Sequence, residues 1–372
     1  MIEALLATAM RTPKALTHAQ MVSLLACDQT DALFQAAYRV KCETLGKRVH
    51  LRGLVEQGNF CSKDCYYCGI RKSNRAVERY ALCSDDVIRM ALWSYEQGYG
   101  SVVLQSGELA SEEHTRQVEH ILMELNRATQ GQLGITLCLG EQNEETYRRW
   151  KAAGAHRYLL RMETSNPVLY AQLHPADHRF EARKQCLMML QQIGYQVGSG
   201  VMIGLPGQTL DDLANDILFY TNLDLDMIGM GPYIPHADTP LGAGLTLDDD
   251  FRKRQLILGL KMIAVTRLQL HDVNIAATTA LQALDEEGRE KGLLAGANVI
   301  MPNVTDVQYR ANYQLYANKP CLDENAAKCR NCLQWRVQSI GEEITWGERG
   351  DPLHFTKKDS RHVLKTNTRH RL

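Results

Sequence analysis

The sequence lacks a hydrophobic run long enough for a membrane span and an excess of charge of either sign. A transmembrane helix takes about 20 consecutive apolar residues, and no such run occurs here. The formal net charge of -1 gives neither nucleic acid nor an anionic membrane an electrostatic attraction. Residues 1–10 are apolar but include Glu3 and lack a basic start, so we expect no signal peptide. These absences favour a cytoplasmic protein that acts on a small molecule.

A fourth metal ligand is missing beside the densest cysteine cluster. Cys61, Cys65 and Cys68 are separated by three and then two residues. A structural zinc site needs four protein ligands, and no further Cys or His lies close enough in sequence to complete one. A 4Fe-4S cluster held by three cysteines leaves one iron open to another ligand. The spacing therefore favours such a cluster. The alternative is a zinc or redox-active loop whose missing ligand comes from elsewhere in the fold.

A second set of three thiols, Cys321, Cys329 and Cys332, lies near the end of the chain. Eleven cysteines, six of them in two tight sets, indicate metal binding in a reducing compartment rather than a disulfide framework. The second set could hold another iron-sulfur cluster (2Fe-2S or 4Fe-4S), or a zinc with an outside ligand, or no metal. We expect the other five cysteines to be small buried hydrophobes.

The order of apolar runs predicts an α/β fold. Residues 1–48 have apolar positions at helical spacing, with Thr17 as a helix cap, and we expect a helical extension. Residues 49–305 alternate eight short apolar runs with amphipathic stretches, the count of a closed (β/α)8 barrel. An open doubly wound sheet is the alternative. The eight runs are residues 51–55, 101–105, 134–139, 157–162, 196–203, 227–233, 274–280 and 297–301. Residues 306–350 form a C-terminal segment, and residues 351–372 a polar tail that we expect to be frayed.

Polar residues gather where the expected strands end, which in a barrel is where chemistry takes place. Gly107 and Glu108 follow the second run, and a glycine there permits a close backbone approach. In the fourth run, alternation puts Arg157, Arg161 and Glu163 on one side. Charges inside a barrel are costly unless they are paired or bind a ligand. Arg161 and Glu163 are therefore site candidates, with a purely structural ion pair as the alternative.

Two further groups of candidates come from later segments. Arg183, in the helix after the fourth run, could reach the same barrel mouth or lie on a solvated face. The hydroxyls and backbone amides of Thr278, Thr279 and Ala280 could form an edge that accepts an anion.

The CxxxCxxC spacing, with Tyr67 directly before the last cysteine, resembles the radical SAM superfamily. Over about residues 50–335 the chain resembles the HydE family of FeFe-hydrogenase maturases within it; biotin synthase and methylornithine synthase are further relatives with the same barrel. The resembling segments are CSKDCYYCGIR from Cys61, LQSGE ending at Glu108, RYLLRMETSNP ending at Pro167, GLPGQT from Gly204, GPYIPHADTPL from Gly231, ATTA ending at Ala280 and GANVIMPN ending at Asn303.

The resemblance implies a barrel with a 4Fe-4S cluster at one mouth and a large internal cavity. The cluster would be held by Cys61, Cys65 and Cys68, and its open iron would bind S-adenosylmethionine (SAM). By position it implies SAM contacts at Tyr67, Gly107, Glu108, Glu163 and Arg183, an anion or substrate site lined by Thr136, Thr278, Thr279 and Ala280, a cavity-closing Tyr313, and an auxiliary cluster at Cys321, Cys329 and Cys332.

The activity that the resemblance implies is reductive cleavage of SAM to a 5'-deoxyadenosyl radical. The radical would act on a small organometallic substrate, an iron-bound cysteine with CO and cyanide, in assembly of the hydrogenase H-cluster alongside sister maturases. We expect a monomer. Two other hypotheses stay open: another radical SAM enzyme, such as a carbon-skeleton mutase or sulfur-inserting synthase, and a non-enzymatic iron-sulfur or zinc carrier.

Overall fold

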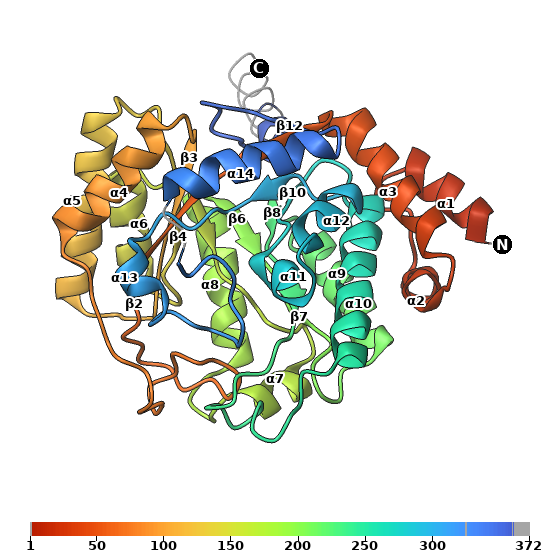
Figure 1. Cartoon of the computed structure of the whole chain (residues 1–372), viewed down its shortest axis with the longest axis horizontal. Coiled ribbons are helices and arrows are strands. Elements are labelled where there is room, and N and C mark those ends of the chain that lie inside the picture. The colour runs from red at the N-terminus through yellow and green to blue at the C-terminus, as the bar shows by residue number, and fades with distance from the viewer. Residues whose placement is uncertain (1, 324–325, 359, 361–372) are drawn as a thin grey trace, which may run out of the picture.

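A curled parallel sheet of seven strands forms the centre of the protein, and helices surround it (Figure 1). The computed structural model describes residues 2–323, 326–358 and 360, without the side chains of residues 327–329. In hydrogen-bonding order the strands are β10 (Asn274–Ile275), β8 (Met227–Ile228), β6 (Gln196–Ser199), β5 (Arg157–Leu159), β4 (Gly134–Cys138), β3 (Ser101–Ser106) and β2 (Gly53–Gly58).

An eighth strand closes the sheet into a barrel. β11 (Val299–Ile300) pairs in parallel with β1 (Arg48–Leu51), which leads directly into β2. On its other side, β11 forms a parallel bridge between Val299 and Ala276, at the end of β10. An open sheet would leave β2 and β10 as edges, whereas here β11 lies between them. The predicted (β/α)8 barrel is therefore confirmed, and the open doubly wound alternative is wrong.

The helices that follow the strands pack around the barrel. They are α4 (Ser84–Glu96), α5 (Glu112–Ala128), α6 (Glu144–Ala152), α8 (Phe180–Ile193), α9 (Leu210–Asn222), α10 (Asp249–Gln269) and α12 (Gly288–Leu294). Several begin at a residue whose side chain accepts a hydrogen bond from the first turn, as Ser111, Asn143 and Asp248 do. Among the described residues, no helix has both the length and the apolar character to cross a membrane.

Short elements lie at the carboxyl ends of the strands. They are α7 (Pro167–Leu173), α11 (Thr279–Leu284), α13 (Val307–Arg310) and a parallel pair formed by β7 (Met202–Ile203) and β9 (Gly231–Pro232). The pair continues the barrel wall beyond β6 and β8. These elements surround the mouth at which the polar candidates gather.

Alternate side chains of β5 point outward to the surrounding helices and inward to the barrel interior. Tyr158 points outward, where its ring packs on Trp150 and Tyr147 of α6 and on Tyr195. Its neighbour Leu159 points inward and lines the barrel cavity. Buried aromatic pairs of this kind add about 0.5–1.5 kcal/mol each beyond the area they bury. The period of two therefore fixes which β5 side chains reach the interior.

The N-terminal segment forms three helices, α1 (Ile2–Arg11), α2 (His18–Ala26) and α3 (Thr30–Leu45), on the outside of α9 and α10 (Figure 1). The predicted cap at Thr17 is confirmed: its hydroxyl accepts from the Gln20 amide, and the Gln20 side chain accepts from the Thr17 amide at 2.9 Å. Lys41 of α3 is fully buried and forms an ion pair with Glu342.

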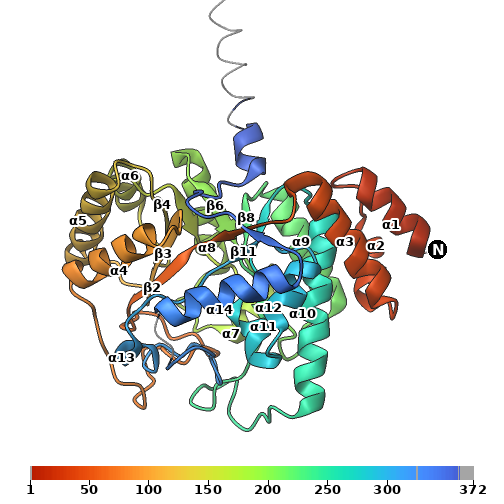
Figure 2. The same cartoon turned by 45° about the horizontal axis from the view of Figure 1, so that its top comes forward.

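The C-terminal segment closes the amino end of the barrel. Helix α14 (Ala326–Ser339) lies across the outside (Figure 2), and β12 (Glu343–Ile344) pairs with β1. Asp351 then accepts from Arg157 at 2.6 Å, and His354 contacts Asp224 and Asp272 at 3.0 and 2.9 Å. Residues 351–358 are thus packed where a frayed tail was expected. Of that tail, residues 359 and 361–372 lie outside the described part of the chain.

Candidate active site

A cavity of about 300 Å³ opens at the carboxyl ends of the strands. Its wall combines the loop after β2, the ends of the following strands and the segment after α13. Most of the predicted site residues line it: Cys61, Cys65, Tyr67, Cys68, Gly107, Glu108, Arg161, Glu163, Arg183, Thr278, Thr279, Ala280 and Tyr313. The structure therefore brings together side chains that are up to 252 residues apart in sequence, from Cys61 to Tyr313.

The three thiols of the first cysteine set share this wall. The Cys61 sulfur accepts N–H bonds from the backbone of Lys63 at 3.4 Å and of Glu108 at 3.3 Å. Burial raises the pKa of Cys65 to about 12 and also raises the pKa of Cys68. Buried thiols of this kind ionise when a metal binds them. Three thiols directed at a cavity, with room for a further ligand, fit an iron-sulfur cluster with three protein ligands.

The loop that carries these thiols is held by its own side chains. Asp64 accepts two hydrogen bonds from Arg71, each at 2.7 Å, and two more from Ser73. The Gly69 amide donates to the carbonyl of Leu315 at 3.0 Å. A Cβ at position 69 would lie 2.1 Å from the Gln314 carbonyl oxygen, so only glycine permits this contact. The C-terminal segment thus packs directly on the cysteine loop.

Position 107 also has to be glycine for steric reasons. A Cβ there would lie 2.2 Å from the carbonyl oxygen of Phe60 and 2.9 Å from the Cβ of Cys61. The end of β3 therefore lies against the backbone from which the first thiol projects. The close approach that the sequence predicted at Gly107 is present, and it is to the cysteine loop.

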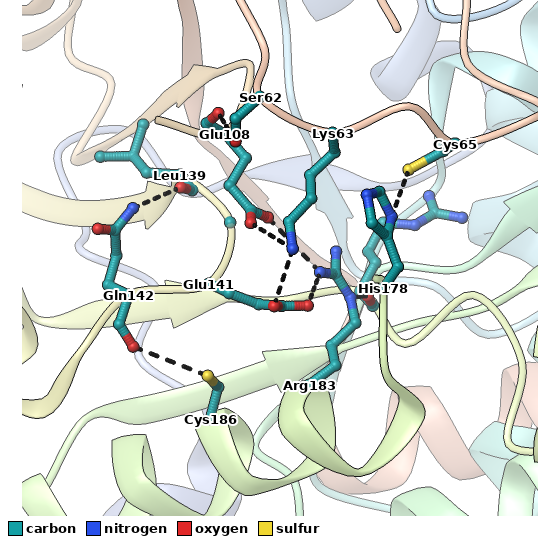
Figure 3. Close-up of polar contacts among 12 residues, drawn as sticks. Ser62, Lys63, Cys65, Glu108, Leu139, Glu141, Gln142, His178, Arg183 and Cys186 are labelled. Carbon is teal, nitrogen blue, oxygen red and sulfur yellow. Dashed lines mark hydrogen bonds and ion pairs between the residues drawn. The ribbon is translucent and has the colours of Figure 1, made fainter. Parts of the chain in front are cut away.

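Two carboxylates and two cations form a buried charge cluster next to the cysteine loop (Figure 3). Lys63 Nζ lies 3.2 Å from Glu108 Oε1 and 3.2 Å from Glu141 Oε2. Arg183 Nη1 lies 2.6 Å from Glu141 and 3.6 Å from Glu108. Arg183 thus reaches the barrel mouth, and the solvated alternative for it is wrong.

The two carboxylates of this charge cluster differ in their electrostatics. Burial raises the pKa of Glu108 despite its two cationic neighbours. Burial acts on Glu141 too, but Arg183 and Lys63 outweigh it and lower the Glu141 pKa. For Lys63, the two carboxylates outweigh burial and raise the pKa. Glu141 is therefore the better compensated of the two carboxylates, and the charge of Glu108 is the less compensated.

The predicted pair of Arg161 and Glu163 is formed. Arg161 donates to Glu163 at 3.1 and 2.9 Å and to the carbonyl of Val201 at 3.0 Å. Glu163 has a φ of 68°, which is unfavourable for a residue with a side chain. Its backbone is held in this conformation by bonds to Gly200 and Met202 at 3.0 and 2.9 Å. Strain of this kind costs of order 1–3 kcal/mol and is typical of functional sites.

The far wall of the cavity contains hydroxyl groups. The buried Thr278 hydroxyl has no hydrogen-bond partner within the described residues, and Tyr313 accepts from Gln105 at 3.2 Å. A buried polar group without a partner is costly, so the Thr278 hydroxyl is a ready contact for a polar ligand.

Thr136 lies apart from this wall. It borders a second, smaller cavity of about 20 Å³ together with Arg52, deeper in the barrel. Thr136 precedes Cys138 by two positions on β4, and Cys138 lines the main cavity. Two residues of strand span about 7 Å, so Thr136 faces inward but lies below the other candidates. The structure does not place it with Thr278 in one cavity.

The second cysteine set is described in part. Cys321 is half-buried with Arg289 Nη2 at 3.8 Å from its sulfur, and Cys332 is exposed on α14. Cys329 belongs to α14, but its side chain lies outside the described part of the chain. The grouping of these three thiols stays a prediction.

Several residues of the cavity wall and of the adjacent charge cluster were not singled out from the sequence. Lys63 lies inside the cysteine motif, and Glu141 follows the third apolar run, so the position of each was a usable signal. Glu56 on β2 forms an ion pair with Lys319, which also donates to the Tyr313 carbonyl at 2.9 Å. Nothing in the local sequence predicts that Lys319 reaches β2.

Two histidines beside Cys65 were also missed. His178 Nδ1 lies 3.8 Å from the Cys65 sulfur, and His174 Nε2 lies 3.2 Å from the Tyr67 hydroxyl. The ligand atoms of Cys65, His174 and His178 all lie within 4.8 Å of one another. A zinc ion at these three groups is therefore the arrangement that competes with a cluster at the three thiols.

Comparison with known proteins defines the class first. Residues 55–220 match the radical SAM superfamily. Methylornithine synthase has a similar fold, with a TM-score of 0.78 and 22% identity over 92% of this chain and 98% of that one. The FeFe-hydrogenase maturase HydG from Carboxydothermus hydrogenoformans superimposes with a TM-score of 0.76 and 19% identity, over 93% of this chain and 79% of that one. The two solved structures show that the fold is shared. The match over residues 55–220, together with the three-thiol site, indicates the class of radical SAM enzymes.

The particular family follows from a closer relative. The chain is 42% identical to the hydrogenase maturase subunit HydE of Thermotoga maritima over 321 residues, which cover 86% of this chain and 89% of the relative. The chain therefore belongs to the HydE family of FeFe-hydrogenase maturases. The family resemblance predicted from the sequence motifs is confirmed.

Proposed function

We propose that this protein cleaves SAM reductively and directs the resulting 5'-deoxyadenosyl radical at a sulfur-containing iron-cysteine substrate with CO and cyanide ligands, in assembly of the FeFe-hydrogenase H-cluster. The observation that carries the proposal is that Cys61, Cys65 and Cys68 share one cavity with Arg161 and Thr278. A ligand at the thiols and a second ligand deeper in the barrel would thus occupy the same space.

The chain's own residues have distinct roles in this proposal. Cys61, Cys65 and Cys68 would hold the 4Fe-4S cluster, which would supply the electron for cleavage of the sulfonium C–S bond. Glu108 binds the amino group of SAM, Gly107 lets the backbone approach, and Tyr67, Glu163 and Arg183 complete the SAM contacts. The rest of the cavity excludes water, because a primary carbon radical reacts with almost any nearby C–H or S–H bond.

The substrate end of the cavity is assigned to Arg161, Thr278, Thr279 and Ala280, with Tyr313 closing it. Within the described residues, Nη1 of Arg161 makes no hydrogen bond and the Thr278 hydroxyl has no partner. These groups suit a substrate that carries negative charge and polar ligands. Thr136 contributes only if the substrate or a water extends into the deeper cavity, since it borders that space.

The central experiment measures SAM cleavage. Anaerobically reconstituted, reduced protein should release 5'-deoxyadenosine from SAM, with the product distribution changed by an iron-cysteine substrate that carries CO and cyanide. Cys65→Ala should abolish cleavage, whereas Cys332→Ala should leave it largely intact. Equal loss in both variants would contradict the assignment of the first thiol set.

The competing hypotheses predict other results. A zinc or iron carrier would bind metal without releasing 5'-deoxyadenosine. A zinc site at Cys65, His174 and His178 would lose its metal in a His174→Ala, His178→Ala protein, and a cluster held by three thiols would persist there. A different radical SAM enzyme would form product from lysine or dethiobiotin.

We further propose an auxiliary cluster at Cys321, Cys329 and Cys332, dispensable for SAM cleavage. Its iron should disappear when all three are replaced by serine, with SAM cleavage retained. Cooperation with sister maturases, a cytoplasmic location and a monomeric state also stay predictions.

A further inference from the structure

The charge cluster of Lys63, Glu108, Glu141 and Arg183 contains equal numbers of cations and anions in a secluded place. The side chains are only 21%, 9%, 16% and 15% exposed, respectively. Each ion therefore depends on the others for compensation, because water reaches the cluster poorly. In Figure 3, the Lys63 ammonium points between the two carboxylates.

A zwitterion can enter such a set without leaving any ion unpaired. An amino acid head group brings one ammonium and one carboxylate. If the ammonium takes the place of Lys63 at Glu108, the freed lysine can pair with the carboxylate that arrives with it. A ligand with the ammonium alone would leave the set with one positive charge in excess, because Lys63 and Arg183 would then share Glu141. The charge cluster is thus complementary to the ammonium and carboxylate groups of an amino acid.

We propose that Lys63 is an internal counter-ion of Glu108 that is displaced by the SAM ammonium group and then binds the SAM carboxylate. This inference rests on the proposed function, because it takes SAM to be the ligand of Glu108. It adds Lys63 to the SAM contacts and makes Glu141 the residue that keeps the lysine within reach during the exchange.

Lys63 is the cation that is free to move. Arg183 is anchored at both ends of its guanidinium, with Nε donating to the Arg161 carbonyl at 2.7 Å and Nη1 to Glu141 at 2.6 Å. Lys63 has a flexible four-carbon side chain and longer contacts of 3.2 Å to each carboxylate. It also projects from the cysteine loop two residues after Cys61, so its ammonium stays close to the thiols wherever it turns.

The two carboxylates likewise differ in how firmly they are paired with cations. Glu141 keeps its contact with Arg183 when Lys63 turns, so it stays compensated. Glu108 has Arg183 only at 3.6 Å and depends mainly on the lysine. Glu108 is therefore the carboxylate that exchanges partners, and Glu141 the one that stays fixed.

The test compares two ligands on the reconstituted holoprotein. SAM carries both head-group charges, and decarboxylated SAM keeps the ammonium and the sulfonium but lacks the carboxylate. Equilibrium binding is measured for wild type, Lys63→Met, Lys63→Arg and the control Lys72→Met, whose lysine lies exposed in the same loop. Iron content is measured for each, so that damage to the cysteine loop is recognised.

Lys63→Met should weaken SAM binding about tenfold or more, the size of one charge-assisted contact, and should weaken binding of decarboxylated SAM little or not at all. Lys63→Arg should restore most of the SAM affinity, and Lys72→Met should match wild type. Glu141→Gln should also weaken SAM binding, but by less in a Lys63→Met protein than in wild type.

Unchanged or tighter SAM binding by Lys63→Met at wild-type iron content would overturn the inference, because the lysine would then be only a competitor of the ligand ammonium. Equal weakening for both ligands would overturn it too. If wild type cleaves SAM while Lys63→Met binds it normally, only this inference fails. If wild type neither binds nor cleaves SAM, the proposed function fails with it.

Discussion

Replacement of Gly107 by alanine tests whether the end of β3 positions the cysteine loop. The added Cβ would lie 2.2 Å from the Phe60 carbonyl oxygen. Carbon–oxygen contacts in proteins are normally about 3.3–3.6 Å, so one backbone must move by about 1 Å. Phe60 directly precedes Cys61, and the displacement is therefore passed to the first thiol.

We expect Gly107→Ala to have a small effect on folding stability and a large effect on cluster loading. Overpacking of a tight site typically costs about 1–3 kcal/mol of folding stability. Metal-ligand distances tolerate only about 0.2 Å, so a shift of about 1 Å at Cys61 should reduce cluster loading far more than it reduces stability. We expect Gly107→Ala to fold but to hold much less iron than wild type after anaerobic reconstitution.

Gly229→Ala is the matched control, since Gly229 lines the same cavity and the nearest atoms to an added Cβ belong to the Leu159 side chain, at an ordinary contact distance of 3.4 Å. All proteins carry Cys321→Ser and Cys332→Ser, so that iron at the second thiol set does not enter the count. Iron per chain and the urea midpoint are measured for each. Wild-type iron content in Gly107→Ala would refute the idea that this contact sets the position of Cys61.

Two further predictions concern ion pairs outside the cavity. Burial opposes the charge of His354, but Asp224 and Asp272 outweigh it and raise its pKa from 6.5 to about 9. Its contribution to stability is therefore complete below about pH 6.5 and is lost as the pH rises through 9, so stability should fall less over this interval in His354→Gln. Lys41→Met leaves Glu342 buried without its cation, which should cost about 3–5 kcal/mol of stability.

Each of these predictions has its own check. Urea unfolding at about pH 6 and about pH 9.5 gives the difference for His354→Gln, and an unchanged difference would show that the histidine is not the titrating group. For Lys41, the variant that also carries Glu342→Gln should recover part of the loss. No recovery would mean that packing, and not the unpaired carboxylate, causes it.

The barrel could be predicted because its signal is repeated. Each of the eight apolar runs contains or adjoins a strand of the structure. Central strands such as β3 and β4 are almost entirely buried, so their sequences are mainly apolar. The ends of the strands were predicted less accurately than their number and order. The run at residues 274–280 includes a strand of only two residues, and from Thr279 onward the chain is helical. Threonine is common in strands and at helix starts alike, so composition does not separate the two.

The site could be predicted where a residue follows a strand, and not where a contact is made across the fold. Arg161 and Glu163 were expected on one face and do form a pair. Arg157 was expected on that same side, but it lies at the opposite end of the barrel, where Asp351 compensates it. Alternation predicts on which face of a strand a side chain lies, but not at which end of the barrel. The Lys319 contact with Glu56 spans 263 residues, and no local pattern encodes it.

The position of β1 has a consequence for synthesis of the protein on the ribosome. β1 is completed early, yet its partners β11 and β12 are made about 250 and 290 residues later. Until then, the backbone groups of this first strand face no permanent neighbour in the nascent chain. An edge of that kind invites mispairing, and contacts between such distant segments form slowly. Synthesis of β11, after about 300 residues, is therefore the event that lets the barrel close.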